Sequence, residues 1–127
     1  MKYLLDTHTV LWTFGNKKKL SKAVVRAIDD PTNEKYVSIA SVWELAIKIG
    51  KGKLVFKGGV KRFFRMIHEN GFGVLPVKPK HVIIIETLPR LHGDPFDRIL
   101  IASAMSEGMC LLTADENIHK YDVPWIW

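Results

Sequence analysis

The stretch Pro95–Thr113, PFDRILIASAMSEGMCLLT, predicts a helix that leads directly into a buried strand. Its first part, Pro95–Glu107, begins with proline at a first helical position and is followed by Gly108, a typical helix stop. Its last part, Met109–Thr113, is a short apolar run of the kind found in strands covered on both faces. A strand of this kind indicates a parallel sheet between layers of helices.

Short apolar segments alternate with helical stripes along the rest of the chain. Strands are expected at Lys2–Leu5, Tyr36–Ala40, Gly73–Val77, Met109–Thr113 and Val123–Trp127. Helices are expected at Ser21–Asp30, Ser41–Gly50, Gly59–Asn70, Pro79–Leu88 and Pro95–Glu107. This alternation requires crossover connections, which favour parallel pairing with helices on both faces. We therefore predict one three-layer α/β/α domain with a mostly parallel central sheet, spanning residues 1–127.

The composition is that of a soluble globular protein with an excess of positive charge. The chain has 127 residues, a length that suits one domain, with 47% hydrophobic and 25% charged residues. Its formal net charge is +6 and its pI is about 9.5. This excess favours a polyanionic partner, such as nucleic acid, an anionic membrane surface or an acidic protein.

The sequence also predicts a cytoplasmic location. No apolar stretch approaches the roughly 18 residues needed to cross a bilayer. The first residues, Met1–Asp6, reach a carboxylate too early for a signal peptide. The single cysteine, Cys110, lies in an apolar run, so we expect a buried thiol in a reducing compartment.

Four acidic residues fall near the expected strand ends. Asp6 directly follows the first strand, Glu44 lies in the first turn of the helix after the second, and Asp115 comes two residues after the fourth. Asp97 begins the helix that leads into the fourth strand, and it reaches the same edge if its helix N-terminus points there. Ligands bind outside the carboxyl ends of parallel strands, so the four side chains could converge on one site.

Most of these acids also have a structural interpretation as helix caps. The alternatives are a capping box of Ser41 with Glu44, an N-cap at Asp94 with Asp97 in the first turn, and a cap by Asp115 on a helical turn at Glu116–His119. Asp6 ends a buried strand, where no capping role is expected. For Asp6 the favoured interpretation is therefore a ligand.

Convergence of these acids would have a chemical consequence. Clustered carboxylates repel one another and are stable only with shared protons or bound cations. Hard oxygen ligands select magnesium or manganese over zinc. Two such ions can orient a water and stabilise the leaving oxygen of a phosphodiester. The histidines, at positions 8, 68, 81, 92 and 119, show no ligand spacing and are interpreted as surface or packing residues.

A basic segment follows Glu44, because no acidic residue lies between it and Glu69. Its cations are Lys48, Lys51, Lys53, Lys57, Lys61, Arg62 and Arg65. They form either a solvated surface or a track for phosphates, and Lys48 could instead pair with Glu44, one turn earlier. We predict that Lys48, Lys51, Lys53 and Lys57 contribute to RNA binding. Trp43, Phe63 and Phe64 could stack on bases, although their helical spacing favours core packing.

Four motifs occur in an order that resembles a known family. They are Leu4–His8 (LLDTH), Ser41–Lys48 (SVWELAIK), Asp94–Ala102 (DPFDRILIA) and Leu111–Asp115 (LLTAD). Together they resemble a PIN domain, specifically the VapC-type toxins of prokaryotic toxin–antitoxin pairs. The resemblance implies an α/β/α fold with a mostly parallel sheet, endoribonuclease activity that depends on Mg²⁺ or Mn²⁺, a homodimer, and neutralisation by a cognate antitoxin protein.

The resemblance also implies roles for individual residues. The catalytic metal-binding acids would be Asp6, Glu44, Asp97 and Asp115, and the neighbouring small polar residues Thr7 and Thr113 would support them. None of the expected acids is missing from the chain.

Three other functions are compatible with the same residues. The first is a non-catalytic RNA- or protein-binding module in which the acids serve as caps. The second is a phospho-acceptor domain of the receiver type, which expects a pair of acids near the first strand, where this chain has only Asp6. The third is a structure-specific DNA nuclease, for which the chain has little room to grip a duplex.

Overall fold

The computed structural model describes all residues from Met1 to Trp127 and contains one five-stranded sheet. Its strands are β1 (Lys2–Leu5), β2 (Glu34–Ser38), β3 (Gly73–Leu75), β4 (Cys110–Leu112) and β5 (Trp125–Ile126). The order across the sheet is β3-β2-β1-β4-β5, and every neighbouring pair is parallel. The predicted three-layer α/β/α architecture with a parallel sheet is therefore confirmed.

Successive side chains of the central strands enter two separate cores, because side chains alternate between the faces of a strand. In β1, Leu5 belongs to one buried cluster and Leu4 to the other. In β4, Leu112 and Leu111 divide in the same way. All four side chains are completely buried. Short, wholly apolar strands follow from this burial on both faces.

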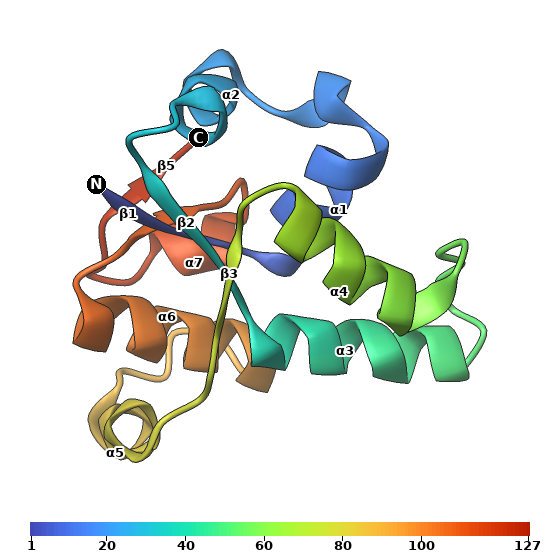
Figure 1. Ribbon diagram of the computed structural model, residues 1–127. Coiled ribbons are helices and arrows are strands. Elements are labelled where there is room, and N and C mark those ends of the chain that lie inside the picture. The colour runs from blue at the N-terminus through green and yellow to red at the C-terminus, as the bar shows by residue number, and fades with distance from the viewer.

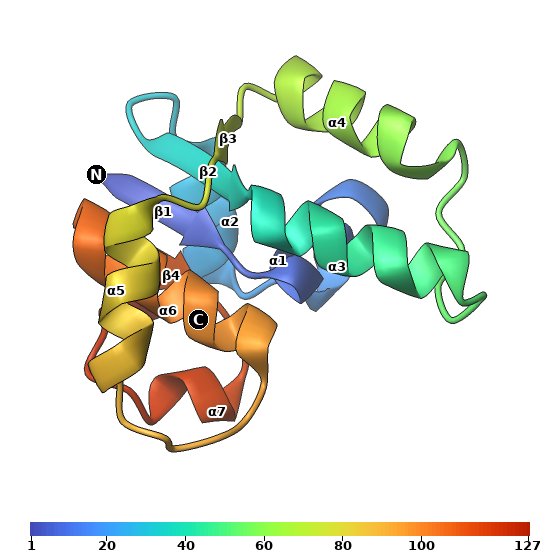
Figure 2. The same cartoon turned by 90° about the horizontal axis from the view of Figure 1, so that it is seen from below.

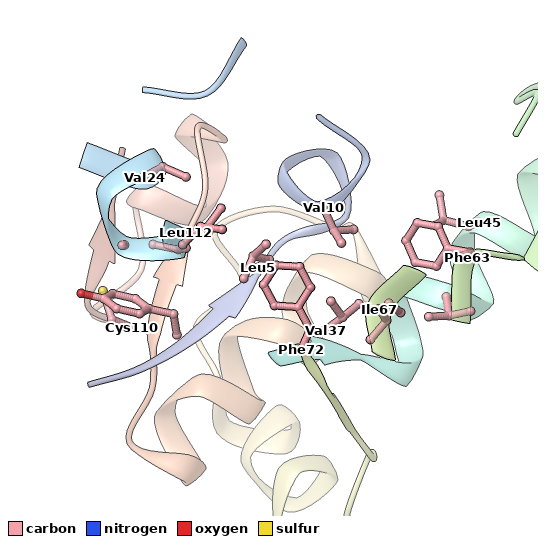
Figure 3. Close-up of a cluster of buried hydrophobic side chains, with 14 residues drawn as sticks. Leu5, Val10, Val24, Val37, Leu45, Phe63, Ile67, Phe72, Cys110 and Leu112 are labelled. Carbon is pink, nitrogen blue, oxygen red and sulfur yellow. The ribbon is translucent and has the colours of Figure 1, made fainter. Parts of the chain in front are cut away.

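The helices cover the two faces unequally. The first core contains side chains of α1 (Thr7–Gly15), α2 (Lys22–Asp29), α3 (Ile39–Gly50) and α4 (Gly59–Glu69). Figure 3 shows Ile67 of α4 beside Val37 of β2, and Phe63 of α4 beside Leu45 of α3, in this core. The second core lies under α6 (Pro95–Glu107) and the short α7 (Glu116–His119), and α5 (Pro79–Thr87) packs against α6. Figure 1 shows α2 on one side of the sheet and α5 and α6 on the other.

Helices α3 and α4 form a pair that extends beyond the sheet, joined by residues 51–58 (Figures 1 and 2). They contact each other, and Leu45 of α3 and Phe63 of α4 share the first core. A short 3₁₀ turn, η1 (Lys17–Lys19), connects α1 to α2. No helix is long and apolar enough to span a membrane.

Two sequence predictions of local structure were wrong. The first missed α1, because Thr7–Gly15 is rich in threonine and aromatic residues and shows no strong helical stripe. The second placed the start of α3 at Ser41, whereas the helix begins at Ile39 and the Ser38 hydroxyl accepts a hydrogen bond from the amide of Ala40 at 3.0 Å. The predicted strand Tyr36–Ala40 is correspondingly shifted toward the N-terminus, to β2.

The other predicted elements were confirmed, most closely at α6. Asp94 caps this helix by accepting hydrogen bonds from the amides of Phe96 and Asp97, as predicted. Gly108 ends it with φ of +66°, a left-handed conformation that glycine adopts without steric cost. This turn sends the chain directly into β4.

The two helix-end glycines Gly108 and Gly50 should respond oppositely to alanine. Gly108→Ala should lower the free energy of unfolding by about 1 kcal/mol, because an L-residue is strained at this φ although its Cβ would meet no atom within 4 Å. Gly50 is the last residue of α3, has ordinary φ and equally open surroundings, so Gly50→Ala should leave stability unchanged or raise it by up to about 1 kcal/mol. Urea unfolding followed by circular dichroism measures both, and equal losses would contradict the conformational explanation.

Candidate functional site

The strand order places a possible site at the carboxyl ends of β1 and β4. The chain adds β2 and β3 on one side of β1, and β4 and β5 on the other, so its direction across the sheet changes at β1. Ligands bind at such a point in open parallel sheets. The residues that follow the two strands, Asp6 and Thr113, lie at this edge, and the amide of Asp6 donates a hydrogen bond to the carbonyl of Leu112 at 3.2 Å.

Asp6 is the most enclosed of the predicted acids, with 5% of its surface exposed. One carboxylate oxygen, Oδ1, accepts the amide of Thr9 at 2.7 Å and thereby caps α1. The other, Oδ2, accepts the hydroxyl of Thr113. The prediction that Asp6 has no cap to make was therefore wrong, and the cause is the undetected helix that begins at Thr7.

Thr113 connects Asp6 to Asp115. Its hydroxyl oxygen accepts the amide of Asp115 at 3.0 Å while its proton is donated to Asp6. Asp115 also caps α7, because its Oδ1 accepts the amide of Asn117 at 2.8 Å. Asp6 and Asp115 line the same hollow of about 290 Å³, whose other walls are His8, Trp12 and Ala114.

Glu44 lies in the second turn of α3, on the side that faces the beginning of α1. Its Oε1 accepts the hydroxyl of the buried Thr7 at 2.7 Å, and its Oε2 lies 3.1 Å from the Lys48 amine. The Thr7 oxygen is also 3.0 Å from the hydroxyl of Ser41. A capping box of Ser41 with Glu44 does not form, because the helix starts two residues earlier, at Ile39.

Asp97 reaches the same edge because α6 runs antiparallel to the strands and leads into β4. The pKa of Asp97 is raised from 3.8 to about 7, mainly by burial and to a smaller extent by the charges of Asp94 and Asp115. A hydrogen bond with His92 acts in the opposite direction. The repulsion by Asp115 means that the two carboxylates are near enough to influence each other across the edge of the sheet.

His92 is a site residue that the sequence interpretation missed, since all five histidines were interpreted as surface or packing residues. Its Nε2 lies 3.1 Å from Asp97 Oδ2, and its Nδ1 lies 2.8 Å from the hydroxyl of Tyr121. Arg98, which is buried, donates to the same hydroxyl at 3.0 Å.

The donors and acceptors of this group have a definite direction. A guanidinium can only donate, so the Tyr121 oxygen accepts from Arg98 and its proton is free for His92 Nδ1. His92 then carries its own proton on Nε2 and donates it to Asp97. The only sequence signal for this contact is the short spacing from His92 to Asp97; nothing marks Tyr121 as their neighbour.

The acids do not form a closed metal cage. Nowhere do three or more carboxylate, imidazole or thiol groups lie close enough together to hold an ion by themselves. Asp6 and Asp115 are linked through Thr113, Glu44 is tied to Thr7, and Asp97 approaches from α6.

The donor chemistry nevertheless fits a hydrated magnesium or manganese ion. Such an ion usually keeps several waters and binds through one or two carboxylates, so it does not need a closed cage. Neither Asp6 nor Asp115 has a cationic partner, whereas Glu44 has Lys48. A buried carboxylate without such a partner is stabilised by a proton or by a bound cation.

The basic segment lies at the outer end of the α3–α4 pair. Lys51, Lys53 and Lys57 are exposed and make no ion pair. Lys48 differs, because it pairs with Glu44, which is one of the two alternatives that the sequence left open. Of the aromatic residues considered for stacking, Phe63 packs in the core as expected. Trp43 is 62% exposed and Phe64 is 37% exposed, so core packing was the wrong expectation for Trp43.

Comparisons with known proteins agree on one family. The model of the PIN domain family matches residues 3–124. Ribonuclease VapC22 of Mycobacterium tuberculosis is 28% identical over 124 residues, which is 95% of this chain and 92% of that protein.

Solved structures share the fold. VapBC2 from Rickettsia felis, bound to a DNA fragment from their promoter, aligns with a TM-score of 0.76 and 14% identity over 99% of this chain and 98% of that one. VapBC-1 from nontypeable Haemophilus influenzae aligns with a TM-score of 0.74 and 18% identity over 99% and 97%.

Replacing Asp97 with asparagine should stabilise the metal-free protein at high pH. The folded protein holds the Asp97 proton more tightly than the unfolded chain, so its stability falls as pH rises from about 4 to about 7 and stays lower above that. Asp97→Asn cannot ionise and still accepts from His92, so it should exceed the parent by roughly 1–4 kcal/mol at pH 8 and match it near pH 4.

Chemical denaturation in a chelator across this pH range measures the difference. Asp122→Asn, at an exposed carboxylate outside the site, controls for the change in net charge. Parallel stability curves for Asp97→Asn and the parent would mean that Asp97 carries no buried charge.

Proposed function

Because the chain belongs to the PIN domain family, we propose that it is a divalent-metal-dependent endoribonuclease that hydrolyses RNA phosphodiesters as the VapC-type toxin of a toxin–antitoxin pair. One observation carries the proposal. Asp6 and Asp115 line one hollow at the carboxyl edge of the sheet, and neither has a cationic partner.

We assign the metal site to Asp6, Glu44, Asp97 and Asp115, with Mg²⁺ or Mn²⁺ as the ion. A bound ion of this kind lowers the pKa of a water and neutralises charge on the phosphodiester. The Thr113 hydroxyl holds Asp6 and fixes the backbone at Asp115. Thr7 restrains Glu44, and His92 fixes Oδ2 of Asp97, which leaves the Oδ1 oxygen for the ion.

A non-catalytic binding module is the second candidate, and a specific observation favours it. Asp6 and Asp115 are both helix N-caps, and Glu44 is half of a salt bridge, so three of the four acids have a structural role without any metal. Substitutions that preserve the caps and remove the charge separate this function from catalysis.

The proposed partners are RNA, a cognate antitoxin protein and a second copy of the chain. An exposed apolar groove of about 450 Å³ supports a protein partner, since monomers rarely expose large apolar patches. The groove is lined by Ile39, Ala40, Trp43, Val77, Pro95, Phe96 and Ile99. Two of these residues, Trp43 and Phe96, directly precede Glu44 and Asp97 in the sequence. A protein bound in the groove would therefore adjoin these acids.

Asp6→Asn should keep the fold and abolish cleavage. Asparagine caps a helix as well as aspartate does, so Thr9 retains its acceptor, while a charged ligand is lost from the hollow. Asp94→Asn is the matched control, because Asp94 is also an N-cap aspartate but is exposed on α6. It should retain activity.

Cleavage of labelled single-stranded RNA in Mg²⁺ and calorimetric titration with Mn²⁺ test this pair of variants. A folded Asp6→Asn protein that cuts RNA at the parent rate would remove Asp6 from the site. Absence of cleavage and of Mn²⁺ binding in the parent would favour the non-catalytic module.

Replacing Lys51, Lys53 and Lys57 with alanine should weaken RNA binding at low salt and flatten its salt dependence. Each phosphate contact contributes a slope near −0.7 in a plot of log affinity against log salt for single strands. Binding of all sequences should weaken alike, because phosphate contacts carry no sequence information. RNA affinity in Ca²⁺ across a salt series measures the effect.

The control variant has alanine in place of three exposed cations outside the basic segment, namely Lys2, Arg26 and Lys120. Lys2 begins β1, and Arg26 and Lys120 lie near the C-terminal ends of α2 and α7, so all three are near the beginnings of strands, away from the carboxyl edge of the sheet. If RNA affinity depends on salt with the same slope in the parent and in the Lys51/Lys53/Lys57 variant, the basic segment would be assigned to a protein partner instead.

A further inference from the structure

The hollow that contains Asp6 and Asp115 has an aromatic wall made by α1. His8 and Trp12, one helical turn apart, both line it. Their ring centroids are 5.8 Å apart and the rings are tilted by 34°. His8 is exposed and Trp12 is half-buried, so both rings are accessible from the hollow.

The Trp12 ring has two further neighbours. The ring of Trp127 lies 5.7 Å away, and the amine of Lys19 lies over the Trp12 ring, 5.6 Å from its centroid. Leu11 and Phe14 of the same helix pack against the first hydrophobic core. Helix α1 thus presents its aliphatic and phenyl groups to the core and a fixed indole to the acidic hollow.

The size and composition of the hollow suit one flat group. Its volume of about 290 Å³ is at the lower limit of ligand pockets, so it accepts part of a larger ligand. Two acids and two aromatic rings line it together with Ala114, and the Lys19 amine lies over the Trp12 ring. A nucleotide has the matching parts, because its flat base suits the aromatic rings and its anionic phosphate suits a divalent cation held by the two acids.

We propose that His8 and Trp12 form a stacking site for a nucleobase, next to the phosphate that a divalent cation on Asp6 and Asp115 would hold. This inference rests on the proposed function, and it adds a subsite for one base to it. A base can enter the hollow only if it is not stacked in a duplex, and every base offers a π-face. The subsite therefore takes an unstacked base of any kind.

Binding of a labelled oligouridylate in Ca²⁺ tests the stacking site, with a base-free ribose phosphate strand of equal length as the comparison. The parent should prefer the strand that carries bases. Trp12→Ala should bind the oligouridylate about 5- to 150-fold more weakly, the range expected for losing one stacked base. It should bind the base-free strand as the parent does, whereas a merely structural loss would weaken both strands equally.

Two further variants make the result decisive. Trp12→Phe keeps an aromatic face and should retain most of the preference for bases. Ile83→Ala removes an exposed apolar side chain of α5 that lines neither the hollow nor the groove, and it should leave binding of both strands unchanged. If Trp12→Ala does not fold, His8→Ala on the exposed side of the wall replaces it, with a smaller loss of the same preference expected.

The outcomes distinguish this inference from the proposed function. Cleavage of RNA by the parent in Mg²⁺ without any preference for bases in Ca²⁺, or with an unchanged preference in Trp12→Ala, would overturn the stacking site and leave the ribonuclease intact. Failure of the parent to bind or cut RNA at all would overturn both.

Discussion

The parallel pairing of β1 with β4 is the constraint on which the rest of the molecule depends. It joins Tyr3–Leu5 to Cys110–Leu112, segments at opposite ends of the chain, and all other strands are added outside this pair. Because Leu4, Leu5, Leu111 and Leu112 are buried completely, a shift of register by one residue would exchange side chains between the two cores. The fixed register in turn brings the Asp6 carboxylate within hydrogen-bond reach of the Thr113 hydroxyl.

The acids at the carboxyl edge combine two roles that sequence arguments treat as alternatives. Asp6 caps α1 with one oxygen and meets Thr113 with the other, and Asp115 caps α7 while it lines the hollow. Helix N-termini favour negative charge, so the caps offset part of the cost of concentrating carboxylates at one edge. Asp97 lies in the first turn of α6 but caps no helix, and burial is the main cause that raises its pKa to about 7. The cap of its helix is supplied instead by Asp94.

Sequence patterns predicted the fold well where local signals and burial agree. Gly108 and Asp94 mark both ends of α6, and the apolar runs mark β1 and β4. The patterns failed where contacts between distant parts of the chain determine the local structure. Helix α1 forms from weak helix formers because Val10 packs in the core and Asp6 caps it. The His92–Tyr121–Arg98 contacts join residues whose proximity depends on the packing of α6 and α7, and no spacing along the chain reveals it.

The distance along the sequence between Asp6 and Asp115 has a consequence for the growing polypeptide. A nascent chain on the ribosome carries Asp6 from the start, yet β1 has no β4 to pair with until residues 110–112 have been made. Long-range parallel pairs form only after a large loop has closed. Translation therefore produces most of the protein before the two carboxylates can share a hollow, and a ribosome-bound fragment that ends before β4 has no assembled site.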